Sequence, residues 1–188
     1  MAQIGLYFGS FNPVHLGHLQ IAQHFLEHAH LEEVWFVISP QNPLKKSQDL
    51  WPYATRLALL KEALKDQTQF LINQIEWQRP APHYTIDTLG ILKEKYPQHS
   101  FSILVGSDNL EQLTQWKDYD ALLEQYPIFV YPRGTQIHSP LSKHPNIHVV
   151  EASLLPISAT AIREKIKEGK SVAKLMPPGC WEWLQNQG

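Results

Sequence analysis

The sequence is poor in cysteine: Cys180 is the single cysteine among 188 residues. One thiol excludes an internal disulfide, and sparse cysteine is typical of a reducing compartment, so we expect a cytoplasmic location. No cysteine motif surrounds Cys180, which fits a small buried apolar residue. The apolar stretch at residues 1–10 is too short and too quickly interrupted for a signal peptide or a membrane span. We therefore expect no association with a membrane.

A strong excess of either charge is also missing. Sixteen basic and eighteen acidic residues give a formal net charge of −2 at pH 7. The densest basic cluster contains only Lys45 and Lys46, which is far less than duplex nucleic acid requires, so we expect no nucleic-acid partner. With 43% apolar residues, the chain fits one domain over residues 1–188 that buries its core without disulfides or metals. Self-association into a homo-oligomer is left open.

Glycine-rich phosphate loops, internal repeats and low-complexity linkers are absent from the sequence. No GxxxxGK[ST] occurs, and no GxGxxG follows the first apolar run, so neither a P-loop nor a dinucleotide fingerprint is present. If the chain binds phosphate, other donors must hold it.

Short apolar runs and helical periods alternate along the chain. The apolar runs predict strands, and apolar residues spaced by three or four predict the helices between them. Strict alternation predicts an α/β fold: a Rossmann-like, doubly wound parallel sheet with helices on both faces, followed by a small helical C-terminal segment. Strands are expected at residues 3–8, 32–39, 69–77, 101–106, 127–133 and 147–152, and helices at 16–29, 53–65, 85–96 and 158–169.

The stretch YFGSFNPVHLGHLQIA places His15 and His18 where the first strand gives way to a helix. A helix N-terminus offers unpaired N–H groups and partial positive charge, and residues three apart project to the same side of it. Gly17 leaves room for a close approach of the backbone. We interpret the pair as a phosphate site. Two ordinary surface histidines are the plain alternative, and a zinc site would need further ligands that no neighbouring motif supplies.

A second polar motif, ISATAIRE, begins the last long helix. Ser158 can cap that helix, Thr160 lies in its first turn, and Arg163 extends from the same face as Thr160. Hydroxyls, N–H groups and a guanidinium suit a triphosphate, although a capped helix with a surface arginine would look the same. Asp108, which follows a strand ending at Gly106, fits either a helix N-cap or a ligand contact.

These segments resemble a known family. GSFNPVHLGH is similar to the GxFxPxHxGH signature of the nucleotidyltransferases that share HxGH with class I aminoacyl-tRNA synthetases, and ISATAIRE resembles their ISxTxIR element. IEWQRPAPHYTIDTL and GSDNLEQLTQWKDYDALL resemble two segments of the bacterial nicotinate-nucleotide adenylyltransferases. The four segments cover nearly the whole chain in the family's order.

The resemblance implies transfer of AMP from ATP to nicotinic acid mononucleotide, with Mg²⁺ bound mainly through the ATP phosphates and no metal-ligating residues of the protein. It implies that His15, His18 and Arg163 act in catalysis and that Tyr84, Thr85 and Trp116 bind the mononucleotide. The implied ATP site consists of Gly9, Ser10, Phe11, His15, His18, Lys45, Gly106, Asp108, Ile157, Ser158, Thr160 and Arg163.

The chain departs from the family pattern at three positions: Asn12 replaces the usual aspartate, Leu44 a histidine and His83 a serine. Whether Lys45 or Lys46 meets phosphate is left open, and Trp116 could instead be a packed aromatic residue. Four alternatives to this function are open. They are adenylyl transfer to nicotinamide mononucleotide, adenylyl transfer to phosphopantetheine, nucleotide binding without catalysis, and a synthetase fragment, which the missing KMSKS-like loop disfavours.

Overall fold

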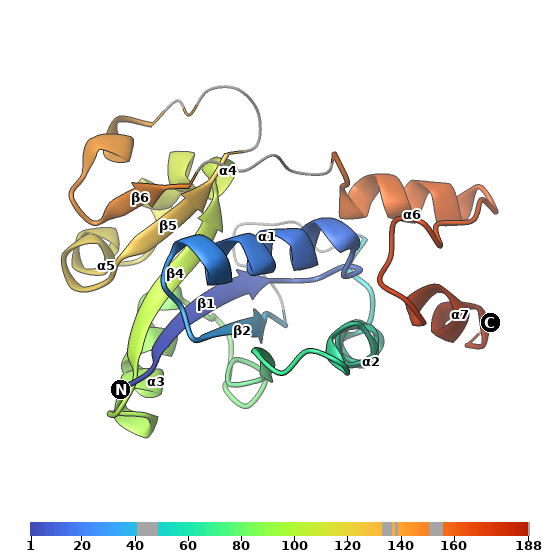
Figure 1. Cartoon of the computed structure of the whole chain (residues 1–188), viewed down its shortest axis with the longest axis horizontal. Coiled ribbons are helices and arrows are strands. Elements are labelled where there is room, and N and C mark those ends of the chain that lie inside the picture. The colour runs from blue at the N-terminus through green and yellow to red at the C-terminus, as the bar shows by residue number, and fades with distance from the viewer. Residues whose placement is uncertain (41–48, 133–136, 138, 151–155, 188) are drawn as a thin grey trace.

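In the part of the chain that the structure describes, six parallel strands form one sheet in the order β3-β2-β1-β4-β5-β6 (Figure 1). The computed structural model describes residues 1–40, 49–132, 137, 139–150 and 156–187. Because the strand order reverses between β1 and β4, their carboxyl ends form the switch point at which such sheets bind ligands. The strands are β1 (Gln3–Gly9), β2 (Glu33–Ile38), β3 (Phe70–Asn73), β4 (Ser100–Gly106), β5 (Ile128–Tyr131) and β6 (Ile147–Val149).

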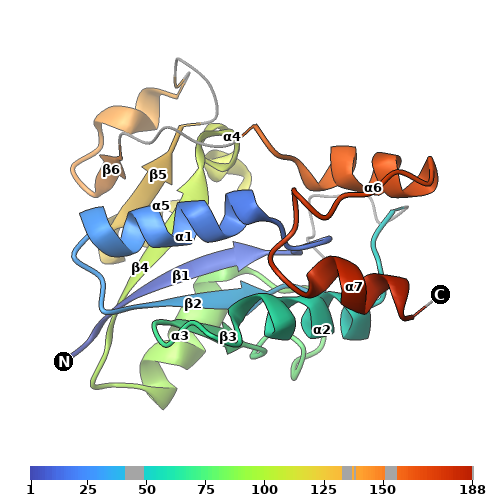
Figure 2. The same cartoon turned by 45° about the vertical axis from the view of Figure 1, so that its right-hand side comes forward.

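Helices cover both faces of the sheet, as predicted, because successive strand residues point to opposite faces. Tyr7 of β1 belongs to a core beneath α1 and α2, whereas Leu6 belongs to a second core beneath α3 and α5. Figure 2 shows α6 and α7 beyond the carboxyl end of β1. The helices are α1 (Leu16–His28), α2 (Tyr53–Leu64), α3 (Thr85–Lys95), α4 (Ser107–Glu111), α5 (Tyr119–Gln125), α6 (Ala159–Lys167) and α7 (Cys180–Gln185), with 3-10 turns at Leu113–Gln115 and Pro140–Lys143.

The third strand is shorter than the sequence predicts. Residues 69–77 are expected to be extended, but β3 ends at Asn73. The Asn73 side chain accepts a hydrogen bond from the Ile75 N–H at 3.0 Å, which turns the chain away from the sheet. The following residues form turns closed by the N–H groups of Trp77 and Arg79. The prediction of a strand over 74–77 is therefore wrong.

The final long helix starts and stops as predicted. Ser158 caps α6 by accepting a hydrogen bond from the Ala161 N–H at 3.2 Å. Beyond the last turn, Gly169 adopts a left-handed backbone (φ +72°). The N–H groups of Gly169 and Lys170 then satisfy the carbonyls of Ile166 and Lys165, a Schellman motif.

Candidate active site

The elbow between β1 and α1 is a tight turn built around Phe11. This residue adopts a left-handed backbone (φ +44°) that is uncommon outside glycine. The residue is 2% exposed, and a Cβ on Gly9 would lie 2.9 Å from Phe11 Cζ, so no side chain fits at Gly9 unless the buried ring moves. Since the Phe11 ring faces the core, Phe11 can offer a ligand only its backbone.

His15 and His18 open α1 with stacked rings, their centroids 3.7 Å apart. His15 is the N-cap residue in an extended conformation, and its N–H donates to His18 Nδ1 at 3.2 Å. Because Nδ1 accepts, the neutral His18 ring carries its proton on Nε2. The elbow therefore presents an Nε2–H donor at a helix start, where the peptide dipoles favour an anion.

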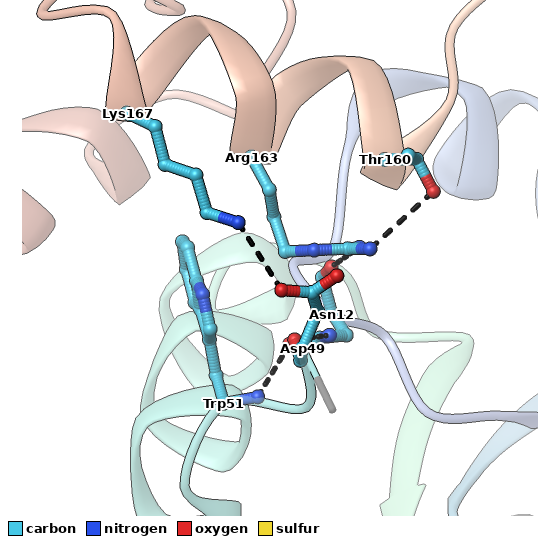
Figure 3. Close-up of polar contacts among 6 residues, drawn as sticks. All are labelled: Asn12, Asp49, Trp51, Thr160, Arg163 and Lys167. Atoms are coloured by element: carbon cyan, nitrogen blue, oxygen red, sulfur yellow. Dashed lines mark hydrogen bonds and ion pairs between the residues drawn. The ribbon is translucent and has the colours of Figure 1, made fainter. Parts of the chain in front are cut away.

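Asn12, the residue that departs from the family's aspartate, connects three parts of the chain (Figure 3). Its Nδ2 donates to the Asp49 carbonyl at 2.8 Å, and its Oδ1 accepts from the Trp51 N–H at 3.0 Å. Its own carbonyl accepts from Arg163 Nη1 at 2.8 Å, across 151 positions of sequence. Asn12 thus joins the segment before α2 and the helix α6 to the elbow.

Figure 3 also shows how α6 lies against this network. Arg163 Nη2 donates to Thr160 Oγ1 at 3.4 Å, as expected for residues on one helix face. Lys167, one turn further on, forms an exposed ion pair with Asp49 at 3.1 Å. At the start of the motif, Ile157 Cβ lies 3.7 Å from where a Cβ of Gly17 would be. The two terminal motifs therefore meet in space.

Arg56 holds the carboxyl ends of β1 and β2 together, although the sequence did not mark it as a site residue. Its guanidinium is buried, with 1% of the residue exposed. It donates to the carbonyls of Ser10 (2.6 Å), Ser39 (2.9 Å), Pro40 (2.9 Å) and Trp51 (3.0 Å). One buried cation therefore fixes four backbone carbonyls around the elbow.

The end of β4 brings Asp108 over Gly106. Gly106 is the N-cap of α4, and Asp108 is the second residue of that helix. The interpretation of Asp108 as a helix N-cap is therefore wrong. A Cβ on Gly106 would lie 2.5 Å from Asp108 Oδ1 and 3.0 Å from the hydroxyl of Tyr131. Only glycine leaves this space at the carboxyl end of β4.

A cleft opens at the switch point, on the α3 side of the elbow. Its wall brings together Gly9 and Ser10 of the elbow, Tyr84 and Thr85 at the start of α3, and Trp116. The predicted mononucleotide residues thus share one cleft with the first two residues of the predicted phosphate site. His15, His18, Asp108 and Arg163 are not part of this wall. Its other lining residues are Phe8, Ser39, Glu76, His83, Val105, Asn109, Gln112, Gln115 and Lys117.

The start of α3 supplies backbone donors to the cleft. Tyr84 is the N-cap in an extended conformation, and no side chain within the described ranges caps that end. The first N–H groups of the helix therefore remain for a ligand or for water. Lys117 at the cleft wall pairs with Asp87 at 2.8 Å, and its Nζ lies 5.2 Å from the centroid of the Tyr84 ring.

Two buried polar residues of the cleft were not among the candidates from the sequence, Glu76 and His83. Glu76 is 2% exposed and its Oε1 accepts from Thr88 Oγ1 at 3.2 Å. Glu76 Oε2 and His83 Nδ1 are buried and lack a hydrogen-bond partner within the described part of the chain. Burial raises the pKa of the Glu76 carboxyl, and the nearby Ser39 hydroxyl and His83 act in the opposite direction.

Lys45, the predicted lysine of the ATP site, lies outside the described residues, as do Leu44 and Lys46. Within the described ranges, no three His, Cys, Asp or Glu side chains are grouped to hold a metal ion. No helix among the described residues is long and apolar enough to cross a membrane.

Comparison of the sequence with known proteins shows the family of the chain. Residues 6–165 match the profile of the family described as cytidylyltransferase-like. The chain is 46% identical over 186 residues to a probable nicotinate-nucleotide adenylyltransferase of Flavobacterium johnsoniae, covering 98% of this chain and 96% of that one. A protein of the same name from Cytophaga hutchinsonii is 46% identical over 174 residues, covering 93% and 91%.

Solved structures share the fold at low sequence identity. A Plasmodium falciparum nicotinic acid mononucleotide adenylyltransferase, described in complex with NaAD, superposes with a TM-score of 0.84 at 19% identity. The match covers 100% of this chain and 96% of that one. It agrees with the order of the six strands and with helices on both faces of the sheet.

Proposed function

The chain belongs to the cytidylyltransferase-like family and, within it, to the nicotinate-nucleotide adenylyltransferases, and on that premise we propose that it transfers AMP from ATP to nicotinic acid mononucleotide, giving deamido-NAD and pyrophosphate. The observation that carries this proposal is the cleft at the switch point, where Trp116, Tyr84 and Thr85 meet Gly9 and Ser10. An aromatic face, helix-start N–H groups and the elbow lie in one wall. A substrate that joins a pyridine ring to a phosphate needs all three.

The mononucleotide would bind with its pyridine ring against the indole of Trp116. A flat aromatic ring suits an indole face, and the ring carboxylate suits the N–H groups at Tyr84 and Thr85. This orientation directs the 5′-phosphate toward Gly9 and Ser10, at the other part of the cleft wall. The acceptor phosphate then lies next to the elbow.

The reaction needs no protein nucleophile. An oxygen of the acceptor phosphate attacks the α-phosphorus of ATP in line, forming one P–O bond while the bond to the bridging α,β oxygen breaks. The leaving group is pyrophosphate, and its negative charge grows as that bond breaks. The protein's contribution is therefore alignment and the stabilisation of charge on phosphate oxygens.

His18 and His15 would supply neutral donors to the triphosphate, with His18 acting through Nε2–H. Arg163, which lies against the elbow through its bond to Asn12, would neutralise the β and γ phosphates together with Lys45. Asp108 at the end of β4 would accept from the ribose hydroxyls. Backbone and hydroxyl contacts to ATP are assigned to Ser10, Phe11, Gly106, Ile157, Ser158 and Thr160.

A divalent ion such as Mg²⁺ is general in nucleotidyltransferases, and here it would arrive as the ATP complex. The residues that would face the phosphates, His18 and Arg163, are donors and cations rather than acids, which fits an ion held by phosphate oxygens and water. Bound there, Mg²⁺ would neutralise charge on the phosphates. The cytoplasmic location remains a prediction from the sequence.

A pyrophosphate-release assay with ATP, Mg²⁺ and a panel of acceptors tests the proposal. We expect pyrophosphate with nicotinic acid mononucleotide, at a kcat/KM at least about tenfold above that for the amide mononucleotide, because the amide leaves polar groups unpaired. Preference for the amide or for phosphopantetheine would replace the acceptor while leaving adenylyl transfer standing. ATP binding without pyrophosphate from any acceptor would contradict the enzymatic assignment.

A further inference from the structure

The cleft wall contains a buried acid and a buried base whose polar atoms are incompletely paired. His83 is 8% exposed and Glu76 is 2% exposed, and both line the cleft with Trp116. His83 Nδ1 and Glu76 Oε2 lack hydrogen-bond partners within the described ranges. Leaving a polar group buried and unpaired is costly, so such atoms in a cleft wall indicate that a ligand or water completes them.

Few other charges face this pair. The titratable residues of the described cleft wall are Glu76, His83, Tyr84 and Lys117, and the Lys117 charge is already paired with Asp87. Behind the wall, Arg79 and Tyr53 interact electrostatically with Glu76. Arg79 carries a permanent charge, and its Nη1 is buried without a hydrogen-bond partner in the described ranges, so Arg79 offsets part of the Glu76 charge at every pH. The part of the charge that changes with pH therefore comes chiefly from Glu76 and His83.

An ionised Glu76 in this wall would repel the carboxylate of the acid mononucleotide and would favour the amide, whose NH₂ can donate to it. A site for the acid must therefore offset that negative charge. His83 is placed to do so, because it precedes the Tyr84 and Thr85 N–H groups in the sequence and lines the same wall. Hydrogen bonds from donors to charged groups are also stronger than those between neutral groups.

We propose that His83 sets the preference for the acid mononucleotide. Its imidazole donates a hydrogen bond to the carboxylate on the pyridine ring, and its positive charge offsets the negative charge of Glu76. The inference rests on the proposed function, since it concerns the ligand of the same cleft. Family members with serine at this position have no cation there. This chain therefore has an acid-recognition device in addition to the backbone N–H groups at the start of α3.

The device has a characteristic pH dependence. Both mononucleotides carry the same pyridinium charge, which a protonated His83 would repel in each, and only the acid adds a carboxylate that a protonated His83 attracts. The preference for the acid over the amide should therefore rise as the pH falls. Both mononucleotides carry the same 5′-phosphate, and both are used with the same ATP. The ratio of their kcat/KM values therefore cancels the titration of the phosphates and reports on the pyridine end of the cleft.

The test measures this acid-to-amide ratio at saturating ATP and Mg²⁺, at about pH 6 and about pH 8.5, which bracket the usual range of histidine. In the wild-type protein the ratio should be higher at the lower pH. In His83→Ser it should fall about tenfold at the lower pH, the loss expected for one hydrogen bond to a charged group, and the pH dependence that remains, which comes from Glu76, should disappear when Glu76→Gln is added. His28→Ser, an exposed histidine on α1, is the matched control and should behave as wild type.

A second substitution separates charge from packing. Glu76→Gln in the His83→Ser background removes the negative charge that His83 no longer offsets, and it should recover about threefold of the lost ratio. A structural defect would not be repaired in this way. Calorimetry in buffers of different ionisation enthalpy should also show proton uptake when the wild-type protein binds the acid, less for the amide, and little for His83→Ser with either.

The outcomes separate this inference from the function on which it rests. If the wild-type protein turns over the acid and His83→Ser keeps a ratio within about twofold of wild type at both pH values, the role of His83 is wrong and the proposed function stands. If the wild-type protein binds neither mononucleotide, both are wrong. A wild-type ratio that does not change with pH would also overturn the role of the His83 charge.

Discussion

The two sides of the switch point differ in how their buried polar groups are paired. On the elbow side, Arg56 donates to four carbonyls and Asn12 uses both ends of its amide. On the cleft side, Glu76 Oε2 and His83 Nδ1 are buried without hydrogen-bond partners in the described ranges. At the elbow, Arg163 Nε is likewise buried without a partner in those ranges, but the backbone there is held by hydrogen bonds of the protein itself, whereas the pyridine end leaves an acid and a base that a ligand can complete.

This difference predicts that the elbow side controls the reaction rate and that the cleft side controls the choice of acceptor. Donors fixed before ATP arrives need not reorganise as charge develops, which is the basis of electrostatic preorganisation. Polar atoms that are paired only in the complex discriminate between ligands, because the wrong ligand leaves them unpaired. Substitutions on the elbow side should therefore reduce stability or turnover, and substitutions on the cleft side should change the choice of acceptor.

The largest effect is expected from Arg56→Met, which keeps the stem but removes the guanidinium. Four carbonyls would lose their donor, and we expect the free energy of unfolding to fall by about 4 kcal/mol. Urea denaturation with matched m-values measures it. Lys61→Met on the exposed face of α2 is the control and should change stability by less than about 0.5 kcal/mol. A loss below about 1 kcal/mol for Arg56→Met would show that water replaces the guanidinium, contrary to a fixed elbow.

His18→Ala should reduce kcat about a hundredfold, equivalent to about 3 kcal/mol, because one preorganised donor to the phosphates is lost. The KM for the mononucleotide should change little, since the cleft wall does not include His18. Steady-state kinetics of the folded variant beside His28→Ala, at the other end of α1, measures the effect. Near-normal turnover of His18→Ala would remove the histidines from the chemistry and leave the elbow only a structural role.

The sequence predicts the sheet well because local patterns determine it: apolar runs and helical periods alternate, and the central strands β1, β2 and β4 bury both faces. It also predicts that the two terminal motifs act together. It misses Arg56 because charged residues are rarely buried, although Arg56 falls on the helical face that α2 buries. It misses the end of β3 because one side-chain hydrogen bond from the Ile75 N–H to Asn73 overrides an apolar pattern. Contacts such as Asn12 with Arg163 depend on tertiary structure and have no local signal.

Arg163→Lys tests whether the second motif acts on ATP. Lysine keeps the charge but loses the planar fork that now contacts both the Asn12 carbonyl and Thr160 Oγ1. We expect kcat/KM for ATP to fall about tenfold to thirtyfold, with the acid-to-amide ratio unchanged. Lys165→Arg on the exposed part of α6 is the control. Wild-type kinetics in Arg163→Lys would make Arg163 a structural residue of the elbow.

The smallest effect, and the sharpest test of the elbow, is expected from Asn12→Asp, which restores the residue usual in the family. The new carboxylate can still accept from the Trp51 N–H, but its second oxygen would face the Asp49 carbonyl that Nδ2 now contacts at 2.8 Å. Attraction to Arg163 offsets part of this repulsion, so we expect a loss of about 1 kcal/mol in the free energy of unfolding at neutral pH.

The direction in which the stability of Asn12→Asp changes with pH follows from this repulsion. A carboxyl facing a carbonyl has a folded-state pKa above its unfolded value of about 3.9. The protonated variant can donate to the Asp49 carbonyl, so its stability should approach that of wild type as the pH falls toward 4 and should decline as the pH rises through the folded-state pKa. Asn12→Ala, which cannot titrate, should lose stability at every pH and is the matched control. If Asn12→Asp is at least as stable as wild type at neutral pH, the bond from Nδ2 to the Asp49 carbonyl does not hold the segment before α2, and the elbow is less completely fixed than its contacts indicate.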